Sequence, residues 1–504
     1  MTPQEAYKEL TQRTKKIATL SSCSSVLAWE ERTYMPRGGA EHRAAQESLI
    51  AGLVHEWLVD PRIGELLATL EASPIVKDPD SIEAANVRET RRLYDRETKL
   101  PKELVEEFTQ TTSLAQGEWA DARKKSDFKH FLPWLEKVVK LTQRVAECYG
   151  YKDEIYDALL DGYEPGMKTA EVVRVFSALR PELVELNKKI AHSKKKPDSS
   201  IVHRAYDKDL QRVFGESVAA AMGFDFNQGR LDVTTHPFCS GFGPGDTRIT
   251  TRYNPNRLND ALFGIMHEAG HALYEMGIDK EHNFGTPVGE ASSLSLHESQ
   301  SRMWENQVGR SREFWVYFFP QAQRIFRDAL GDVTLDAFYG AINYSEPSYI
   351  RVEADEATYN LHIMLRFELE RAIIKGDLKP ADIPGEWNRR FKEYVGIEVD
   401  KDSNGCLQDV HWSAGLFGYF PTYCLGTMYS AQFFAKAKKD MPDLAKQIEQ
   451  GNLSGLLGWL RKNIHQFGSR YRAADLGKRV TGEVLSHKPL MDYMNKKYGE
   501  IYGF

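Results

Sequence analysis

The sequence has few cysteines and no long apolar run. Its five cysteines, at positions 23, 148, 239, 406 and 424, include no CxxC pair. Cysteines that are odd in number and widely scattered indicate reduced, mostly buried thiols in a reducing compartment. No window approaches the ~20 apolar residues that a membrane-spanning helix needs. The polar segment 1–16 also lacks the apolar core of a secretory signal, so we predict a cytoplasmic protein that does not enter a membrane.

The chain also lacks an excess of basic residues. It carries 66 Lys and Arg against 72 Asp and Glu, a formal net charge of -6. Nucleic acids and anionic membrane surfaces favour a basic protein face, so neither is the expected partner. The charge balance instead favours a small or peptidic partner.

Most of the sequence shows helical periodicity. In the first segment, for example, apolar residues at positions 6, 10, 17 and 20 fall at helical spacing and are separated by polar residues. One stretch, 229–254, departs from this pattern. It is rich in Thr, Val, Phe and Gly, and its DTRITTRY segment alternates as a half-buried strand does. We therefore predict a mainly α fold with a small β-sheet directly before the helix that follows.

That helix carries the motif His-Glu-Ala-Gly-His at 267–271. On a helix, His267 and His271 lie one turn apart on a single face, which suits a shared metal ion. A catalytic zinc ion takes three protein ligands and leaves a fourth position to water. The motif thus indicates a zinc-dependent metallopeptidase with Glu268 as general base. The alternative is a surface helix with two incidental histidines.

The third ligand has two candidates. The metzincin motif would place a histidine at position 277, where Gly277 stands, so the ligand is expected to be a carboxylate from a following helix. Glu290 follows a proline and a glycine in an irregular stretch, whereas Glu298 lies inside a predicted helix, and we favour Glu298. Its neighbours His297 and Gln300 either orient the ligands or are ordinary polar positions.

Six motifs follow one another between residues 236 and 412. They are His236-Pro237-Phe238, Asp246-x-Arg248-x-Thr250, the HEAGH segment, His297-Glu298-Ser299-Gln300, Ile350-Arg351-x-x-Ala354-Asp355 and Gly405-x-x-Gln408-Asp409-x-His411-Trp412. In this order they resemble the motifs of the carboxypeptidase Taq family of thermostable metallocarboxypeptidases. The segments WEERTYMPRGGAEHRAAQ and HWSAGLFGYFPTY look similar as well, so the resemblance extends over the whole chain.

The resemblance implies an elongated helical fold with a deep central groove, similar to neurolysin and angiotensin-converting enzyme, and a homodimer. It also implies release of single amino acids, with broad specificity, from peptides with a free C-terminus. His267, His271 and Glu298 carry over as metal ligands and Glu268 as the base. We predict one peptidase unit over 1–504, with two lobes flanking the groove as one possibility, and a metal-site core over 229–310. One Zn²⁺ per chain is expected, with Co²⁺ or Mn²⁺ able to substitute.

A C-terminal exopeptidase must bind a free carboxylate, and the planar fork of arginine bonds both of its oxygens. Arg351 and Arg248 are the candidates, and the resemblance assigns such arginines to the closed end of the groove. Each has a structural alternative. Arg351 can pair with the nearby Glu353 or Asp355, and Arg248 can form a salt bridge with Asp246.

The tetrahedral intermediate of peptide hydrolysis needs a hydrogen-bond donor besides the metal. Tyr419 and Tyr423 in GYFPTY are candidates for this role, unless they are core aromatics. His236 and His411 are candidates for binding the substrate backbone or the same anion, and His411 is favoured. A lone histidine is more often a structural residue.

Two other functions stay open on the sequence. An endo-acting oligopeptidase or dipeptidyl carboxypeptidase would use the same metal core with the groove open on the C-terminal side. A helical scaffold without metal would only bind peptides, but the intact Glu268 speaks against it.

Overall fold

The computed structural model describes all 504 residues, which form two compact units. The first unit comprises Met1–Thr98, Asp198–Ile342 and Ser430–Val484, and the second comprises Lys99–Pro197, Asn343–Tyr429 and Leu485–Phe504. None of the helices has the length and apolar character needed to span a membrane. All five cysteines are free, but only Cys406 and Cys424 are buried and Cys23 is exposed, so the prediction of mostly buried thiols was wrong.

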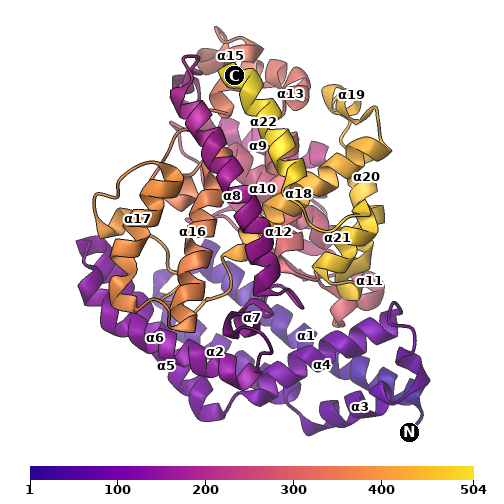
Figure 1. The fold of residues 1–504 in the computed structure, drawn as a ribbon. Coiled ribbons are helices and arrows are strands. Elements are labelled where there is room, and N and C mark those ends of the chain that lie inside the picture. The colour runs from indigo at the N-terminus through magenta and orange to yellow at the C-terminus, as the bar shows by residue number, and fades with distance from the viewer. The chain divides into compact units, whose positions relative to one another are not determined.

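Helices build both units (Figure 1). Those of the first unit are α1 (Pro3–Thr33), α2 (Ala40–Leu58), α3 (Pro61–Glu71), α4 (Ile82–Lys99), α9 (Lys208–Met222), α10 (Leu258–Gly277), α11 (Lys280–Asn283), α12 (Leu294–Arg302), α13 (Arg312–Ile325), α14 (Arg327–Leu330), α15 (Leu335–Ile342), α19 (Leu444–Glu449), α20 (Ser454–Asn463) and α21 (Ala473–Thr481). Those of the second are α5 (Lys102–Lys125), α6 (Phe128–Tyr149), α7 (Ile155–Leu160), α8 (Thr169–His192), α16 (Glu356–Lys375), α17 (Ile383–Val395) and α22 (Lys488–Tyr502). The last residue of α4, Lys99, already belongs to the second unit. Helix α18 (Pro421–Asp440) begins in the second unit and ends in the first. The predicted mainly α fold is confirmed.

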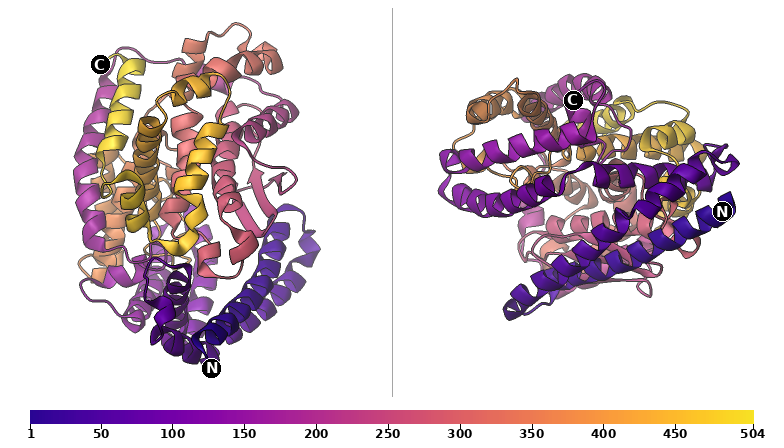
Figure 2. Two further views of the ribbon diagram at one scale, coloured as in Figure 1. Left: turned by 90° about the vertical axis from the view of Figure 1, so that its right-hand side faces the viewer. Right: turned by 90° about the horizontal axis from the view of Figure 1, so that it is seen from below.

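A three-stranded sheet lies in the first unit. Its strands β1 (Gly229–Val233), β2 (Cys239–Gly243) and β3 (Asp246–Thr251) are arranged in the order β1-β3-β2. Strand β1 pairs in parallel with β3, and β2 pairs antiparallel with it. Helix α1 packs on β2, and Figure 2 shows the indigo α1–α2 hairpin beside the strands. The small sheet predicted within 229–254 is therefore present.

Helix α10, which carries the HEAGH motif, is enclosed on several sides. It packs against α9, α12 and β3, and apolar side chains such as Leu262, Ile265, Met266 and Leu273 are buried along it. Burial around much of the circumference marks a core helix, because a surface helix buries a single stripe. This excludes the alternative of a surface helix with incidental histidines.

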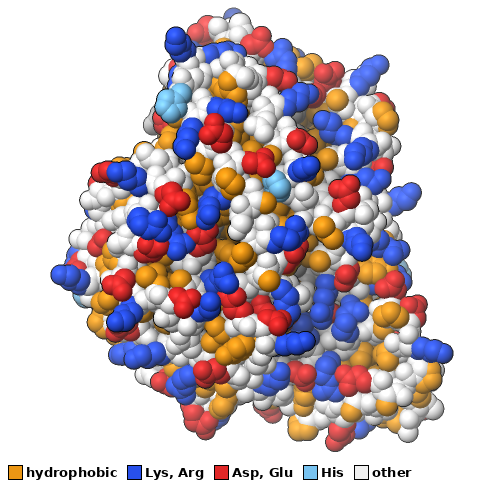
Figure 3. Space-filling view, viewed as in Figure 1, with side chains coloured by type: hydrophobic (Ala, Val, Ile, Leu, Met, Phe, Trp, Pro, Cys, Tyr) orange, Lys and Arg blue, Asp and Glu red, His pale blue; other side chains and the backbone are white.

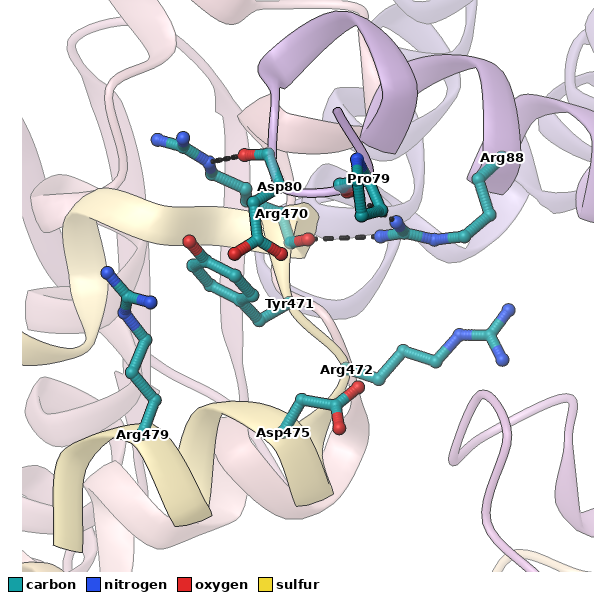
Figure 4. A pocket seen from close by; sticks show the side chains of 8 residues that line it. All are labelled: Pro79, Asp80, Arg88, Arg470, Tyr471, Arg472, Asp475 and Arg479. Atoms are coloured by element: carbon teal, nitrogen blue, oxygen red, sulfur yellow. Dashed lines mark hydrogen bonds between the residues drawn. The ribbon is translucent and has the colours of Figure 1, made fainter. Parts of the chain in front are cut away.

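Two arginines brace helix α4 against the segment that precedes α21 (Figure 4). Arg88 donates hydrogen bonds to the carbonyl oxygens of Arg470, at 3.0 Å, and of Pro79, at 3.3 Å. Arg470 in turn donates to the carbonyl oxygen of Asp80. These guanidinium groups satisfy backbone acceptors that have no partner in a helix or sheet. Both arginines line a pocket of the first unit, and we interpret their hydrogen bonds there as structural.

Candidate metal centre

Three potential metal ligands converge in the first unit. Helix α10 supplies His267 and His271, and α12, capped by the Ser293 hydroxyl, supplies Glu298. The Oε2 atom of Glu298 lies 3.6 Å from Nε2 of His267 and 3.4 Å from Nε2 of His271. One ligand atom from each residue lies within 4.8 Å of the others. Glu290, the competing candidate, is exposed and lies outside this group.

Helix α12 can approach α10 this closely because residue 270 is a glycine. A Cβ atom on Gly270 would lie 2.7 Å from Cα of Ser301 and 2.8 Å from the carbonyl oxygen of Gln300. Both are backbone atoms, so only a displacement of α12 would make room for a side chain. The glycine inside the HEAGH motif therefore helps to position Glu298.

We expect Gly270→Ala to destabilise the protein by about 1–3 kcal/mol, the usual effect of inserting a methyl group into a packed core. The variant should also bind metal more weakly, because α12 carries Glu298. Denaturant unfolding and metal titration measure the two effects. Gly264→Ala is the matched control on the same helix, since its Cβ would meet nothing closer than 3.7 Å. Equal behaviour of the two variants would contradict this role for Gly270.

A carboxylate that the sequence analysis missed holds His267. Glu305 lies on the π-helical segment Met303–Val308, and its Oε2 is 2.9 Å from Nδ1 of His267. Arg302 and Arg310 lie 3.3 and 3.6 Å from the two carboxylate oxygens of Glu305. An imidazole whose Nδ1 proton is donated to a carboxylate presents its Nε2 lone pair to a metal.

The electrostatics of the group fit a cation. Burial lowers the pKa of His267, but the carboxylates of Glu298 and Glu305 outweigh it and raise that pKa to about 9. Burial lowers the pKa of His271, which has no such pair of carboxylate neighbours, to about 3. Burial also raises the pKa of Glu268 to about 7. Buried carboxylates thus draw a proton onto His267, at the place where a metal cation would neutralise the same charge.

His271 is held through a second histidine. Its Nδ1 is hydrogen-bonded to Nδ1 of His297, whose Nε2 lies 2.7 Å from Oε1 of Glu275. His297 thus contacts a proposed ligand, as a residue that orients the ligands must. Gln300 does not; its Oε1 lies 2.9 Å from Nε2 of the buried His465.

Arg248, on β3, forms the salt bridge that was its structural alternative. Its Nε and Nη2 atoms lie 2.9 and 2.7 Å from the two carboxylate oxygens of Asp246. The guanidinium group also stacks 4.3 Å from the ring centroid of Trp29. His236 is exposed in the loop between β1 and β2. Binding of substrate by Arg248 and His236 stays a prediction.

Arg351, in the second unit, is buried and pairs with a partner that was not predicted. Its Nε and Nη2 lie 3.0 and 2.8 Å from Oδ1 of Asp409, and its Nη1 lies 3.1 Å from the Tyr359 hydroxyl. The other oxygen of Asp409 binds Arg366. Arg351 therefore pairs with Asp409, and not with its sequence neighbours Glu353 or Asp355 as the structural alternative assumed.

The remaining predicted residues surround Arg351 in the same unit. The His411 ring lies 5.5 Å from that of Tyr419 and 6.4 Å from that of Tyr423, between ring centroids. The Arg351 guanidinium lies 5.3 Å from the Tyr423 ring. Burial lowers the pKa of His411 to about 4, so its imidazole is neutral near pH 7. The structure thus brings four of the predicted residues into one cluster.

The sequence matches, over residues 9–498, the family model described as Carboxypeptidase Taq (M32) metallopeptidase. The chain belongs to this family. It is 48% identical to thermostable carboxypeptidase 1 of Thermus thermophilus, with 100% of both chains covered. It is 37% identical to carboxypeptidase 1 of Bacillus subtilis, over 98% of each. The solved structure of an M32 carboxypeptidase from Deinococcus radiodurans R1 superimposes with a TM-score of 0.95 at 37% identity, covering 99% of this chain and 100% of that one.

Membership in the M32 family confirms the predicted family and the predicted enzyme class. The protein is a metallocarboxypeptidase, a peptide hydrolase whose chemistry requires a divalent metal. The group formed by His267, His271 and Glu298 is compatible with holding that metal.

Proposed function

We propose that this M32 enzyme uses zinc to hydrolyse the C-terminal bond of peptides and to release single amino acids with broad specificity. The convergence of His267, His271 and Glu298 carries the proposal, because two imidazoles and one carboxylate are a preferred donor set for catalytic zinc. Such a set also accepts Co²⁺ or Mn²⁺. Zinc held there supplies a Lewis acid that polarises the scissile carbonyl and acidifies water.

Glu268 is the proposed general base. It takes a proton from the attacking water and passes it to the leaving amine. The side chain is next to His267 in sequence and only 7% of the residue is exposed. Burial raises its pKa to about 7, so the carboxyl group gains and loses a proton readily near neutral pH. A bound cation would lower this pKa and increase the ionised fraction.

Arg351 is the proposed partner of the substrate carboxylate. Two guanidinium groups, of Arg351 and Arg366, share the single carboxylate of Asp409, so this buried cluster keeps a net positive charge. A carboxylate ligand would neutralise that charge by bidentate hydrogen bonds. Arg248 is the second proposed partner of the carboxylate, although Asp246 already occupies two of its donor atoms.

Tyr419, Tyr423 and His411 are the proposed donors to the developing oxyanion. Their support is that they lie in one cluster, that tyrosine hydroxyls donate at neutral pH, and that a neutral imidazole keeps one N–H donor. His236, exposed at the β1–β2 loop, is proposed to contact the substrate backbone.

The proposal is tested with one defined peptide in two forms, one with a free C-terminal carboxylate and one with an amide. The free acid should lose one amino acid at a time from its C-terminus, and the amide should resist cleavage, because only the free acid offers an anion to Arg351. A time course of released amino acids measures both. Equal cleavage of the two peptides would indicate an endopeptidase, and release of dipeptides would indicate a dipeptidyl carboxypeptidase.

We also propose that the enzyme is a cytoplasmic homodimer acting as one unit over 1–504, with 229–310 as its metal-site core. The predicted likeness to neurolysin and angiotensin-converting enzyme belongs to the same proposal. Basic and acidic side chains are interspersed on the face seen in Figure 3, which supports a partner other than nucleic acid or an anionic membrane. Sedimentation of the purified protein tests the dimer.

A further inference from the structure

A hydrogen-bonded chain of side chains leads away from one of the proposed metal ligands. Nδ1 of His271 bonds to Nδ1 of His297, and Nε2 of His297 lies 2.7 Å from Oε1 of Glu275. The other oxygen of Glu275 forms an ion pair with Nζ of Lys280, on α11. The side chains of Glu275 and Lys280 are 11% and 7% exposed. The chain therefore runs from the ligand into the interior of the first unit.

The direction of each hydrogen bond follows from counting protons. An ionised carboxylate only accepts, so Glu275 receives the Nε2 proton of His297. The ion pair with Lys280 favours the ionised form of Glu275. When the single ring proton of His297 lies on Nε2, its Nδ1 carries a lone pair. It accepts the Nδ1 proton of His271, whose own lone pair then lies on Nε2.

That lone pair is the one the metal needs. Nε2 is the atom of His271 that lies 3.4 Å from Glu298. The opposite set of protons would have His297 donate to His271, and the Nε2 atom of His271 would then carry a proton and be unable to ligate. Which nitrogen of His271 carries the proton therefore depends on the carboxylate of Glu275, which is linked to His271 through His297.

We propose that Glu275 and Lys280 are positioning residues of the metal centre, which act through His297 to hold the His271 ring and its tautomer ready to bind the metal. This inference rests on the proposed assignment of His271 as a ligand. Glu305 does the same for His267 directly, so the two histidines have different supports.

The ion pair of Glu275 and Lys280, at the far end of the hydrogen-bonded chain, is tightly packed. A Cβ atom on Gly241 of β2 would lie 2.7 Å from Oε2 of Glu275 and 3.1 Å from Nζ of Lys280, so the strand backbone presses against the ion pair. Removing Lys280 leaves the charge of Glu275 buried and uncompensated, and its other partner, His297, then carries the effect toward His271. We therefore expect the loss of Lys280 to change the orientation or the tautomer of the His271 ring.

The test compares Lys280→Met and Glu275→Gln with Lys497→Met. Lys497 forms a buried pair of the same type with Glu356 in the second unit, at 2.7 Å, with side chains 5% and 3% exposed. The zinc dissociation constant, measured by competition with a chelator, should rise about 10–100-fold in the first two variants and stay unchanged in Lys497→Met. The visible absorption spectrum of the cobalt-loaded protein should change in the same two variants only, because the ligand field at His271 changes.

Wild-type zinc affinity and an unchanged cobalt spectrum in Lys280→Met and Glu275→Gln would overturn the inference. Glu275→Gln keeps the shape of the side chain, so it remains informative if Lys280→Met fails to fold. The wild-type protein distinguishes failure of the proposed function from failure of this inference. If the wild-type protein binds no zinc, both are wrong. If all variants bind zinc equally well, only the inference is wrong.

Discussion

Replacing His271 by alanine is expected to release the metal and abolish peptide hydrolysis. The variant retains only two of the three proposed ligands. Loss of a group that merely orients a ligand weakens metal binding about 10–100-fold, so loss of the ligand itself should cost more. At one equivalent of metal, we expect hydrolysis below roughly 1% of the wild-type rate, because the Lewis acid is absent. Metal content after dialysis and the rate of amino-acid release measure the two effects.

The control for this variant is His282→Ala. His282 is an exposed histidine of the same unit, with a side chain 75% exposed and bonded to Asp279. It should keep its metal and its activity. If His271→Ala retained one equivalent of metal, the assignment of His271 as a ligand would be wrong.

Replacing Glu268 by glutamine is expected to lower kcat about 10²–10⁴-fold while the metal stays bound. A general base contributes a rate factor of this size, and glutamine has the shape of glutamate but cannot take up the proton of water. Glu268 is outside the proposed ligand set, so metal affinity should change little. Kinetics at saturating peptide, together with metal content, separate the two effects.

Glu449→Gln makes the same chemical change on an exposed carboxylate of α19 and should have wild-type kinetics. A fall of less than about tenfold in Glu268→Gln would argue against general-base catalysis by this residue. Loss of the metal would instead indicate that Glu268 is a ligand.

Much of the metal-site region could be predicted because its signals are local. The change from helical to alternating periodicity placed the sheet within 229–254, and the spacing of the HEAGH motif placed His267 and His271 on one face of α10. Glu298 was preferred over Glu290 because it was predicted to lie inside a regular helix and Glu290 in an irregular stretch. In the structure, Glu298 lies within α12 and Glu290 directly follows a short 3-10 helix.

Residues that depend on tertiary packing were missed. Glu305 reaches His267 from a π-helical segment, and a sequence pattern that assumes α-helical spacing does not place such a residue. Asp409 is 58 residues from Arg351, so a search among sequence neighbours of the arginine could not find it. Glu275 is different. It follows His271 by four residues on the same helix face, and this spacing could have identified it.

The most direct test of the account is an anomalous difference map, recorded at the zinc absorption edge, from crystals of the zinc-loaded enzyme. We predict one strong peak per chain, bounded by Nε2 of His267, Nε2 of His271 and the carboxylate of Glu298. A peak held by Glu290, or by Glu305 in place of Glu298, would contradict the proposed centre, as would a zinc-loaded crystal with no peak between the two histidines.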